Sequence, residues 1–113
     1  DFYISSSSAN EVFATNIVGS PDRGAMNLFG SSYEGSGTYS RTYYTKFTAY
    51  INIAFSQGTN AYRSTANHEF GHVLGLGHDM SVSNAIMNGN RNVEVIYTPR
   101  RDDINGVETI WGL

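Results

Sequence analysis

The sequence predicts an α+β fold, because β-type patterning fills its first half and helical patterning begins near its middle. The clearest β signal is TYYTKFTAYINIAFS at 42–56, where alternate positions are apolar. The clearest helical signal is AYRSTANHEFGHVLGL at 61–76, whose small, apolar and histidine residues recur every three or four positions. In the strand, one face is expected to pack in the core: Phe47, Ala49, Ile51, Ile53 and Phe55.

Shorter elements are expected before the main strand. Residues 11–18 (EVFATNIV) mix β-branched and aromatic side chains and read as a strand, as does the shorter AMNLFG at 25–30. GSPDRG at 19–24 has the composition of a turn between them. FYIS at 2–5 is also prone to form β-structure. The sheet is therefore expected to use several short segments around one long strand.

The helical segment carries its own end signals. Ser64 or Thr65 would cap it if it started late, and Gly75 and Gly77 mark its end. A second helix is expected at the C-terminus, where Thr98 and Pro99 resemble a cap followed by proline at the first helical position. Its apolar stripe is Ile104, Val107, Ile110 and Trp111.

Composition bounds the class of protein. A chain of 113 residues is expected to form one domain over 1–113, and its net charge of −3 includes no basic cluster that would grip nucleic acid. The absence of cysteine excludes disulfides and thiolate ligands within the chain. No apolar run reaches membrane-spanning length, so a membrane partner is not expected. The start, DFYISSSS, lacks a signal-peptide pattern, so an exported protein would already have lost its leader.

All three histidines fall within eleven consecutive positions, in HEFGHVLGLGHD at 68–79. His68 and His72 are four apart and share one helix face, and a turn at Gly75 can return His78 toward them. Three imidazoles with one coordination position left for water are typical of a catalytic zinc site. Glu69 is not needed as a ligand, so its carboxylate is free to act as a general base.

Two plainer interpretations compete with this one. A lone helical histidine is a ligand in about one case in ten, but the pattern HExxHxxGxxH arises by chance in a chain of this length on the order of a few times in a million. A structural zinc site would need a fourth protein ligand; the chain has no cysteine to supply it, and Asp79 is the remaining candidate. The catalytic interpretation is preferred.

The motif HEFGHVLGLGH resembles the signature of the metzincin zinc peptidases, which continues into a methionine turn. NAIMNG supplies that turn with Met87, and RRDDINGVETIWG at 100–112 is similar to the closing helix of the matrixin branch. The resemblance covers about 47–113 and is most specific at 68–87. It implies a twisted mixed β-sheet, an active-site helix carrying HExxH and a C-terminal helix, without the N-terminal strand and helix of the family.

By resemblance, His68, His72 and His78 would ligate one catalytic zinc ion, and Glu69 would deprotonate the zinc-bound water that attacks a peptide bond. Met87 would form a packed floor beneath the metal, and the segment from there to Tyr97 would form a wall of the substrate pocket. The resemblance thus implies a secreted zinc endopeptidase. Its substrate would be an extended peptide or protein lying along an edge strand, supplied by SGTYSRTYY at 36–44 or by AMNLFG.

Departures from the family pattern give further expectations. Asp79 after the third histidine resembles the adamalysin branch and is expected to brace the methionine turn. With no histidine left over, the second, structural zinc of vertebrate matrixins is not expected. Calcium stays open but is not indicated by any loop spacing; the acidic candidates are Asp22, Glu34, Asp102 and Asp103. The last two are expected in the first turn of the final helix.

The missing N-terminal strand and helix raise the hypothesis that the domain is truncated or processed and that another polypeptide supplies the segment. A second class of function also stays open, namely a zinc-binding but non-catalytic binding module. A different hydrolase with the same ligands is a third, less favoured reading. Glu69 argues for catalysis, because a pure binding site has no need of that carboxylate.

Overall fold

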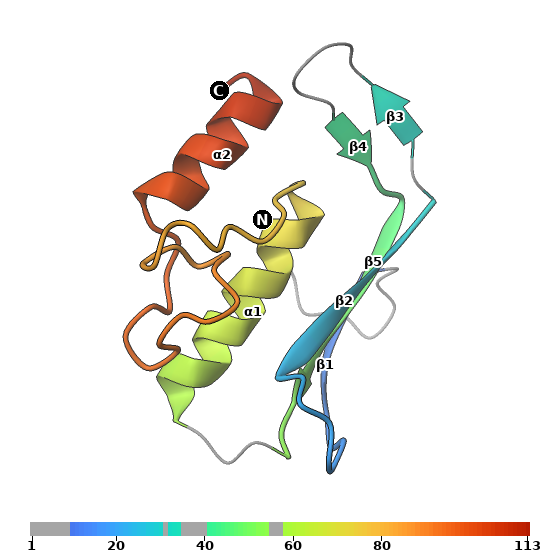
Figure 1. The fold of residues 1–113 in the computed structure, drawn as a ribbon. Helices are drawn as coiled ribbons and strands as arrows, with labels where there is room; N and C mark the ends of the chain where they lie inside the picture. Colours follow the sequence, from blue (N-terminus) through green and yellow to red (C-terminus); the bar gives the residue numbers. More distant parts are fainter. Residues whose placement is uncertain (1–9, 31, 35–40, 55–57) are drawn as a thin grey trace.

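The computed structural model describes residues 10–30, 32–34, 41–54 and 58–113, and it confirms the α+β class (Figure 1). Five strands precede two helices within these residues. The bounds are β1 Glu11–Thr15, β2 Gly24–Phe29, β3 Ser32–Glu34, β4 Arg41–Tyr43, β5 Lys46–Asn52, α1 Thr59–Val73 and α2 Arg101–Trp111.

The main sheet is mixed, as the resemblance implied, with β5 at its centre and the order β1-β5-β2. β1 runs parallel to β5, pairing Val12 with Ala49, and β2 runs antiparallel to it, pairing Met26 with the same residue. β3 and β4 form a separate antiparallel pair. Among the described residues β1 and β2 are therefore the two edges of the main sheet, and α1 lies against one face of it (Figure 1).

The predicted strand at 42–56 is divided into β4 and β5, and its core face is only partly right. Phe47 and Ala49 are buried as expected, but Ile53 is 49 % exposed and Asn52, assigned to the other face, is 1 % exposed. Asn52 is buried because its amide serves four backbone groups: its Oδ1 accepts from the N–H of Ile17 and Ala54, and its Nδ2 donates to the carbonyls of Ile17 and Asp22. The side chain thus ties the loop between β1 and β2 to the end of β5.

The shorter strands follow the predictions with changed ends. The strand expected at 11–18 stops at Thr15, and the one at 25–30 is β2, shifted by one residue. The expected β-prone segment 2–5 lies outside the described residues, as do Phe55 and residues 36–40 of the candidate edge segment 36–44. β2 is therefore the candidate edge strand that the structure describes in full.

Helix α1 begins earlier than expected, at Thr59 with Gly58 as its N-cap. The expectation that Ser64 or Thr65 caps it is wrong: both lie inside the helix, where the Ser64 hydroxyl donates to the carbonyl of Ile96 at 2.6 Å. The helix packs closely on the sheet because Gly24 has no side chain, and a Cβ there would lie 2.7 Å from the Cγ2 of Thr65. Ser64 and Thr65 are small residues on the face of α1 that is buried against the rest of the protein, and this burial, rather than capping, explains their place in the helix.

The end of α1 was predicted correctly at Gly75, and its hydrogen bonds form a Schellman motif. The N–H of Gly75 donates to the carbonyl of His72 at 3.1 Å, and the N–H of Leu76 donates to that of Gly71 at 3.0 Å. Gly75 has φ +93°, which glycine adopts without steric cost. The chain reverses sharply here, which carries it back toward the helix face it has just left.

Helix α2 starts at Arg101, so the cap expected at Thr98 and Pro99 is wrong. Arg100 is the N-cap, and its N–H donates to the carboxylate of Asp103 at 2.8 Å, which sets the first turn two residues later. Asp102 and Asp103 do lie in that first turn, as expected. At the other end of the helix, the indole N–H of Trp111 donates to the carbonyl of Leu74 at 2.9 Å, joining the C-terminal ends of the two helices.

The core around the loop between the helices is small and apolar. Ile86, Met87 and Ile96 are buried together, with Leu76 packed against them. Leu76 in turn lies against Gly106 of α2, where a Cβ would come within 2.8 Å of its Cδ2. Gly106, a residue that is unfavourable inside a helix, therefore has a packing reason. Neither helix of the described chain is both long and apolar enough to cross a membrane.

Candidate metal centre

The structure brings His68, His72 and His78 together. Their ring centroids form a nearly equilateral triangle with sides of 5.0, 4.9 and 5.0 Å. One ring nitrogen from each lies within 4.8 Å of the others, and within the described residues this is the one group of three or more potential metal ligands. Two members come from one face of α1, and the turn at Gly75 returns the third, as the sequence predicted.

Two of the rings are oriented by backbone carbonyls. The Nδ1 of His68 lies 2.8 Å from the carbonyl oxygen of Ile86, and the Nδ1 of His72 lies 2.8 Å from that of Leu76. A carbonyl can only accept, so each Nδ1 must carry the proton. In the neutral form of each ring, the lone pair then lies on Nε2, and a hydrogen-bonded carbonyl behind the ring is the usual arrangement at a protein metal site.

The spacing between two of the nitrogens fits a zinc ion. The Nε2 atoms of His68 and His78 are 3.1 Å apart. Tetrahedral zinc with nitrogen ligands at 2.0–2.1 Å places neighbouring ligands about 3.3 Å apart. The donor set is three imidazoles, which suits zinc and leaves room for a water molecule in a fourth position.

Burial sets the charge of the site. His68 is 7 % exposed, and burial lowers its pKa to about 4, so its ring is neutral at physiological pH. Glu69 is 8 % exposed, and burial raises its pKa, although His78 and Arg91 oppose the shift. Asp22, just before β2, also raises it. The neutral ring of His68 and the more basic carboxylate of Glu69 belong to consecutive residues of α1.

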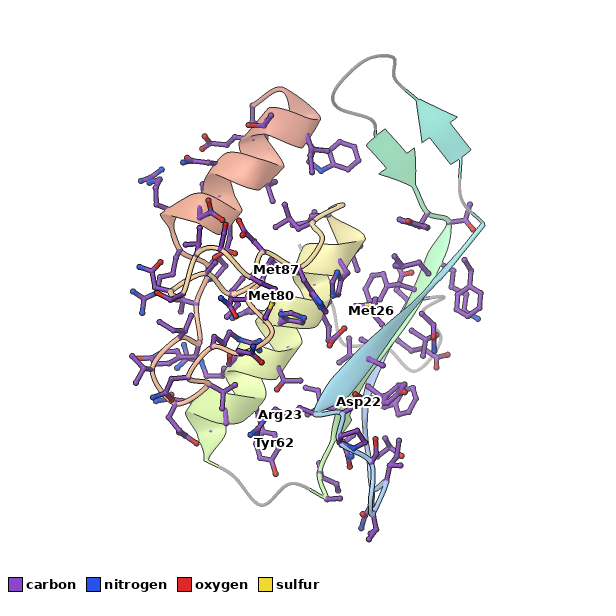
Figure 2. The ribbon with its side chains drawn as sticks, viewed as in Figure 1. Asp22, Arg23, Met26, Tyr62, Met80 and Met87 are labelled. Carbon is purple, nitrogen blue, oxygen red and sulfur yellow. The ribbon has the colours of Figure 1, made fainter. Side chains whose placement is uncertain are left out.

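Met87 lies beside α1, in the buried segment Ala85–Asn88 (Figure 2). Its side chain packs against the helix at Gly71, where an added Cβ would overlap the Sδ atom and lie 3.2 Å from Cε. Gly71 stands between His68 and His72 in the sequence, so the methionine contacts the backbone that carries both rings. Its position as a floor of the histidine site stays a prediction.

Asp79 braces the methionine turn through its backbone, whereas its carboxylate bonds to Ser81. Its N–H donates to the carbonyl of Met87 at 3.1 Å, while the carboxylate accepts from the N–H and hydroxyl of Ser81. Those bonds from Ser81 lower the pKa of Asp79.

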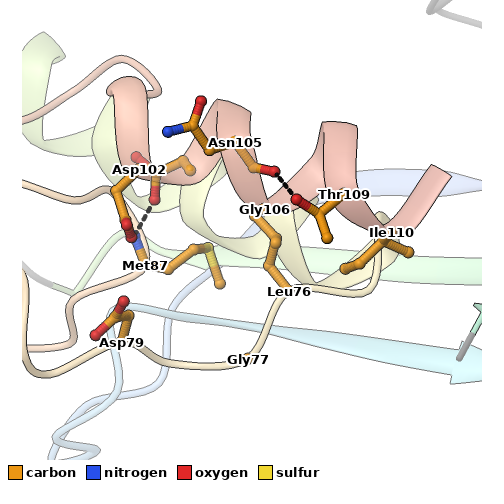
Figure 3. Close-up of a pocket in the computed structure, with 10 residues that line it drawn as sticks. Leu76, Gly77, Asp79, Met87, Asp102, Asn105, Gly106, Thr109 and Ile110 are labelled. Carbon is orange, nitrogen blue, oxygen red and sulfur yellow. Dashed lines mark hydrogen bonds between the residues drawn. The ribbon is translucent and has the colours of Figure 1, made fainter. Parts of the chain in front are cut away.

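The carboxylate that holds the turn is that of Asp103, whose oxygens accept from the N–H groups of Ile86 and Met87 at 2.8 and 3.1 Å. Figure 3 shows the pocket between this turn and α2 that Asp79, Met87 and Asp102 help to line.

The segment after the turn is fastened to α1 at several points. Its Tyr97 carbonyl accepts from the Asn67 amide at 2.8 Å, and the guanidinium of Arg63 lies 4.9 Å from the centre of the Tyr97 ring. Arg91 reaches further in and contacts Ser64 and the ring of His68. The segment is therefore fixed against α1, while its role as a pocket wall and the contact of Tyr97 with substrate stay predictions.

Of the acidic calcium candidates, Asp22, Asp102 and Asp103 do not form a group of three potential ligands in the described part of the chain, and the side chain of Glu34 lies outside it. Sequence reasoning missed three contributors to the site: Ser64, Arg91 and the brace formed by Asp103. Arg91 gave no signal, because an isolated arginine in a polar loop is usually solvated. Asp102 and Asp103 did give a signal, but it indicated an interaction with the helix dipole and not the hydrogen bonds of Asp103 to the turn at Ile86 and Met87.

Comparison with known proteins agrees with this geometry. Residues 10–112 match the family described as Matrixin, of the M10 peptidases, so the match includes the five strands and two helices that the structure describes. No curated protein and no solved structure matches the chain. The family match together with three converging histidines in an HExxHxxGxxH motif places this chain in the matrixin family of peptidases.

Proposed function

We propose that this protein is a zinc-dependent endopeptidase that cleaves extended polypeptides. The observation that carries the proposal is the orientation of His68 and His72: both rings have Nδ1 bonded to a carbonyl, and the Nε2 of His68 lies 3.1 Å from the Nε2 of His78. Three prepared nitrogens next to a buried glutamate are the elements that a hydrolytic zinc site requires. The family match supports the same class of enzyme.

When bound, zinc supplies a Lewis acid that polarises a peptide carbonyl and acidifies a water molecule. His68, His72 and His78 would hold the ion, and the carbonyls of Ile86 and Leu76 would keep two of these rings in the binding orientation. Glu69 would take a proton from the attacking water and pass it to the leaving amine. Burial raises the pKa of Glu69, which makes its carboxylate a stronger base for the first of these transfers.

The substrate is proposed to lie along the outer edge of β2. β2 is a sheet edge within the described residues, and its backbone on that side is not used by β5. The start of β2 also lies next to α1, because a Cβ at Gly24 would lie 2.7 Å from the Cγ2 of Thr65. An extended peptide can add to such an edge by backbone hydrogen bonds, which favour polypeptides without a fixed sequence. The family membership supports an extracellular location for this activity.

The competing proposal is a zinc-binding module without catalysis, and Glu69→Ala separates the two. Zinc binding is expected to persist in the variant, because the three converging ligand residues are histidines and Glu69 is not one of them. Cleavage of an unfolded protein substrate is expected to fall by about 10²–10⁴-fold, the usual contribution of a general base. Glu108→Ala, which removes an exposed carboxylate on α2, is the matched control and should keep wild-type activity. Zinc-loaded wild type that cleaves no peptide would favour the binding module.

A further inference from the structure

Arg91 makes a dense set of contacts for a loop arginine. Its Nε donates to the hydroxyl of Ser64 at 2.7 Å, and its Nη2 donates to the carbonyl of the same residue at 3.1 Å. Its Nη1 donates to the carbonyl of Asn88 at 3.1 Å. One guanidinium thus joins α1, one turn before His68, to the residue that follows Met87.

The same guanidinium reaches a predicted zinc ligand. Nη1 lies 3.3 Å from the Nδ1 of His68. That ring nitrogen must carry a proton, because it donates to the carbonyl of Ile86, so the two N–H groups cannot bond to each other. Arg91 therefore acts on His68 by occupying the space at its ring edge and by fixing the backbone on which its acceptor lies.

The backbone connection is short. Ile86, which orients the ring, is two residues before Asn88, which Arg91 holds. Asn88 is 6 % exposed and Ile86 is 1 % exposed, so this part of the loop has little room for other positions. Releasing Asn88 from α1 would let the Ile86 carbonyl shift, and the His68 ring would lose its fixed orientation.

Charge alone does not explain an arginine at this place. A cation beside a site that binds a dication opposes metal binding by simple repulsion. What arginine offers over lysine is a planar fork that can serve two acceptors on α1 and one on the loop at the same time. The benefit of Arg91 to the site must therefore come from geometry.

We propose that Arg91 is a positioning residue of the zinc site, which locks the His68 ring by fastening the Ile86–Asn88 backbone to Ser64 of α1. The inference rests on the proposed function, since it takes His68 to be a zinc ligand. It adds a second support behind that ligand, which neither the motif nor the family match assigns.

The test compares zinc affinity in purified full-length variants, measured by competition with a coloured chelator. Arg91→Gln and Arg91→Lys are both expected to weaken zinc binding about 10-fold or more, the usual cost of losing a residue that supports a ligand. The visible spectrum of the cobalt-substituted protein should change in both, because it reports the geometry of the ligands. Asn67→Ala is the matched control: it releases the same loop at Tyr97, away from His68, and should leave affinity and spectrum unchanged.

Several results would overturn the proposal. Folded Arg91→Gln protein with wild-type affinity and spectrum would show that the contact is incidental. Wild-type affinity in Arg91→Lys would show that charge, not the fork, is what matters. A loss in Asn67→Ala equal to that in Arg91→Gln would reduce Arg91 to a general loop anchor. If Arg91 variants fail to fold, Ser64→Ala removes one acceptor and should weaken zinc binding in the same direction by a smaller factor. Wild-type protein that binds no zinc would refute the proposed function itself.

Discussion

The carboxylate of Asp103 in α2 holds the backbone of Met87, accepting its N–H at 3.1 Å and that of Ile86 at 2.8 Å. The same carboxylate accepts from the N–H of Arg100 and so begins the helix. The carbonyl of Ile86 orients the ring of His68. Asp103, 35 positions after that histidine, therefore supports the backbone that holds the ring in place. The C-terminal helix is therefore coupled to the metal centre through one buried side chain.

Asp103→Ala is expected to lower the free energy of unfolding by about 3 kcal/mol, because it leaves buried N–H groups without their charged acceptor. The measurement is urea unfolding of the metal-free protein. Asp102→Ala is the control, since its carboxylate contacts no N–H group of the turn that the structure describes, and it should cost less than about 1 kcal/mol. Equal losses in the two variants would contradict the coupling.

Gly71→Ala is expected to destabilise the protein by about 1–3 kcal/mol, although alanine ordinarily favours a helix. The added methyl group would occupy the place of the Met87 side chain, which must then move. Gly77→Ala provides the comparison, because a Cβ there meets nothing within 4 Å. Thermal unfolding would check both variants, and a Gly71→Ala protein as stable as wild type would show that Met87 is not packed as described.

Glu69→Gln is expected to stabilise the metal-free protein at neutral pH. Burial raises the pKa of Glu69 in the folded state, so the wild type loses stability as pH rises from the ordinary glutamate value through the raised one. The amide carries no charge and avoids this cost. The gain in melting temperature should be present at pH 7 and vanish well below the ordinary pKa, where wild-type Glu69 is protonated in both states. A gain that is independent of pH would point to another cause.

The neutral His68 gives the opposite dependence. Its pKa of about 4 in the folded state lies below its ordinary 6.5, so the unfolded chain takes up the proton first as pH falls. Wild-type protein should therefore lose stability relative to His68→Asn between about pH 6.5 and 4, by up to roughly 3 kcal/mol. Urea unfolding of the metal-free pair across this range would check it, and parallel pH profiles would contradict the burial of His68.

Features that depend on residues near one another in the sequence could be predicted, and features that depend on contacts between distant residues could not. His68 and His72 were placed by helical periodicity, and the left-handed Gly75 by its residue type, because both are local properties. The face of Asn52 was misjudged because its burial depends on carbonyls more than 25 residues away. The same holds for Arg91, because its two acceptors on Ser64 become neighbours only after folding.

The most direct test of the central claim is the zinc content of purified wild type and His72→Ala, determined by elemental analysis. His72→Ala removes one of the three converging nitrogens while keeping Glu69 and the other two. About one zinc ion per chain in the wild type, lost in the variant, is the result expected of a catalytic site with three histidine ligands. Folded wild-type protein that takes up no zinc, or a variant that keeps it fully, would contradict the assignment of these histidines as the ligands.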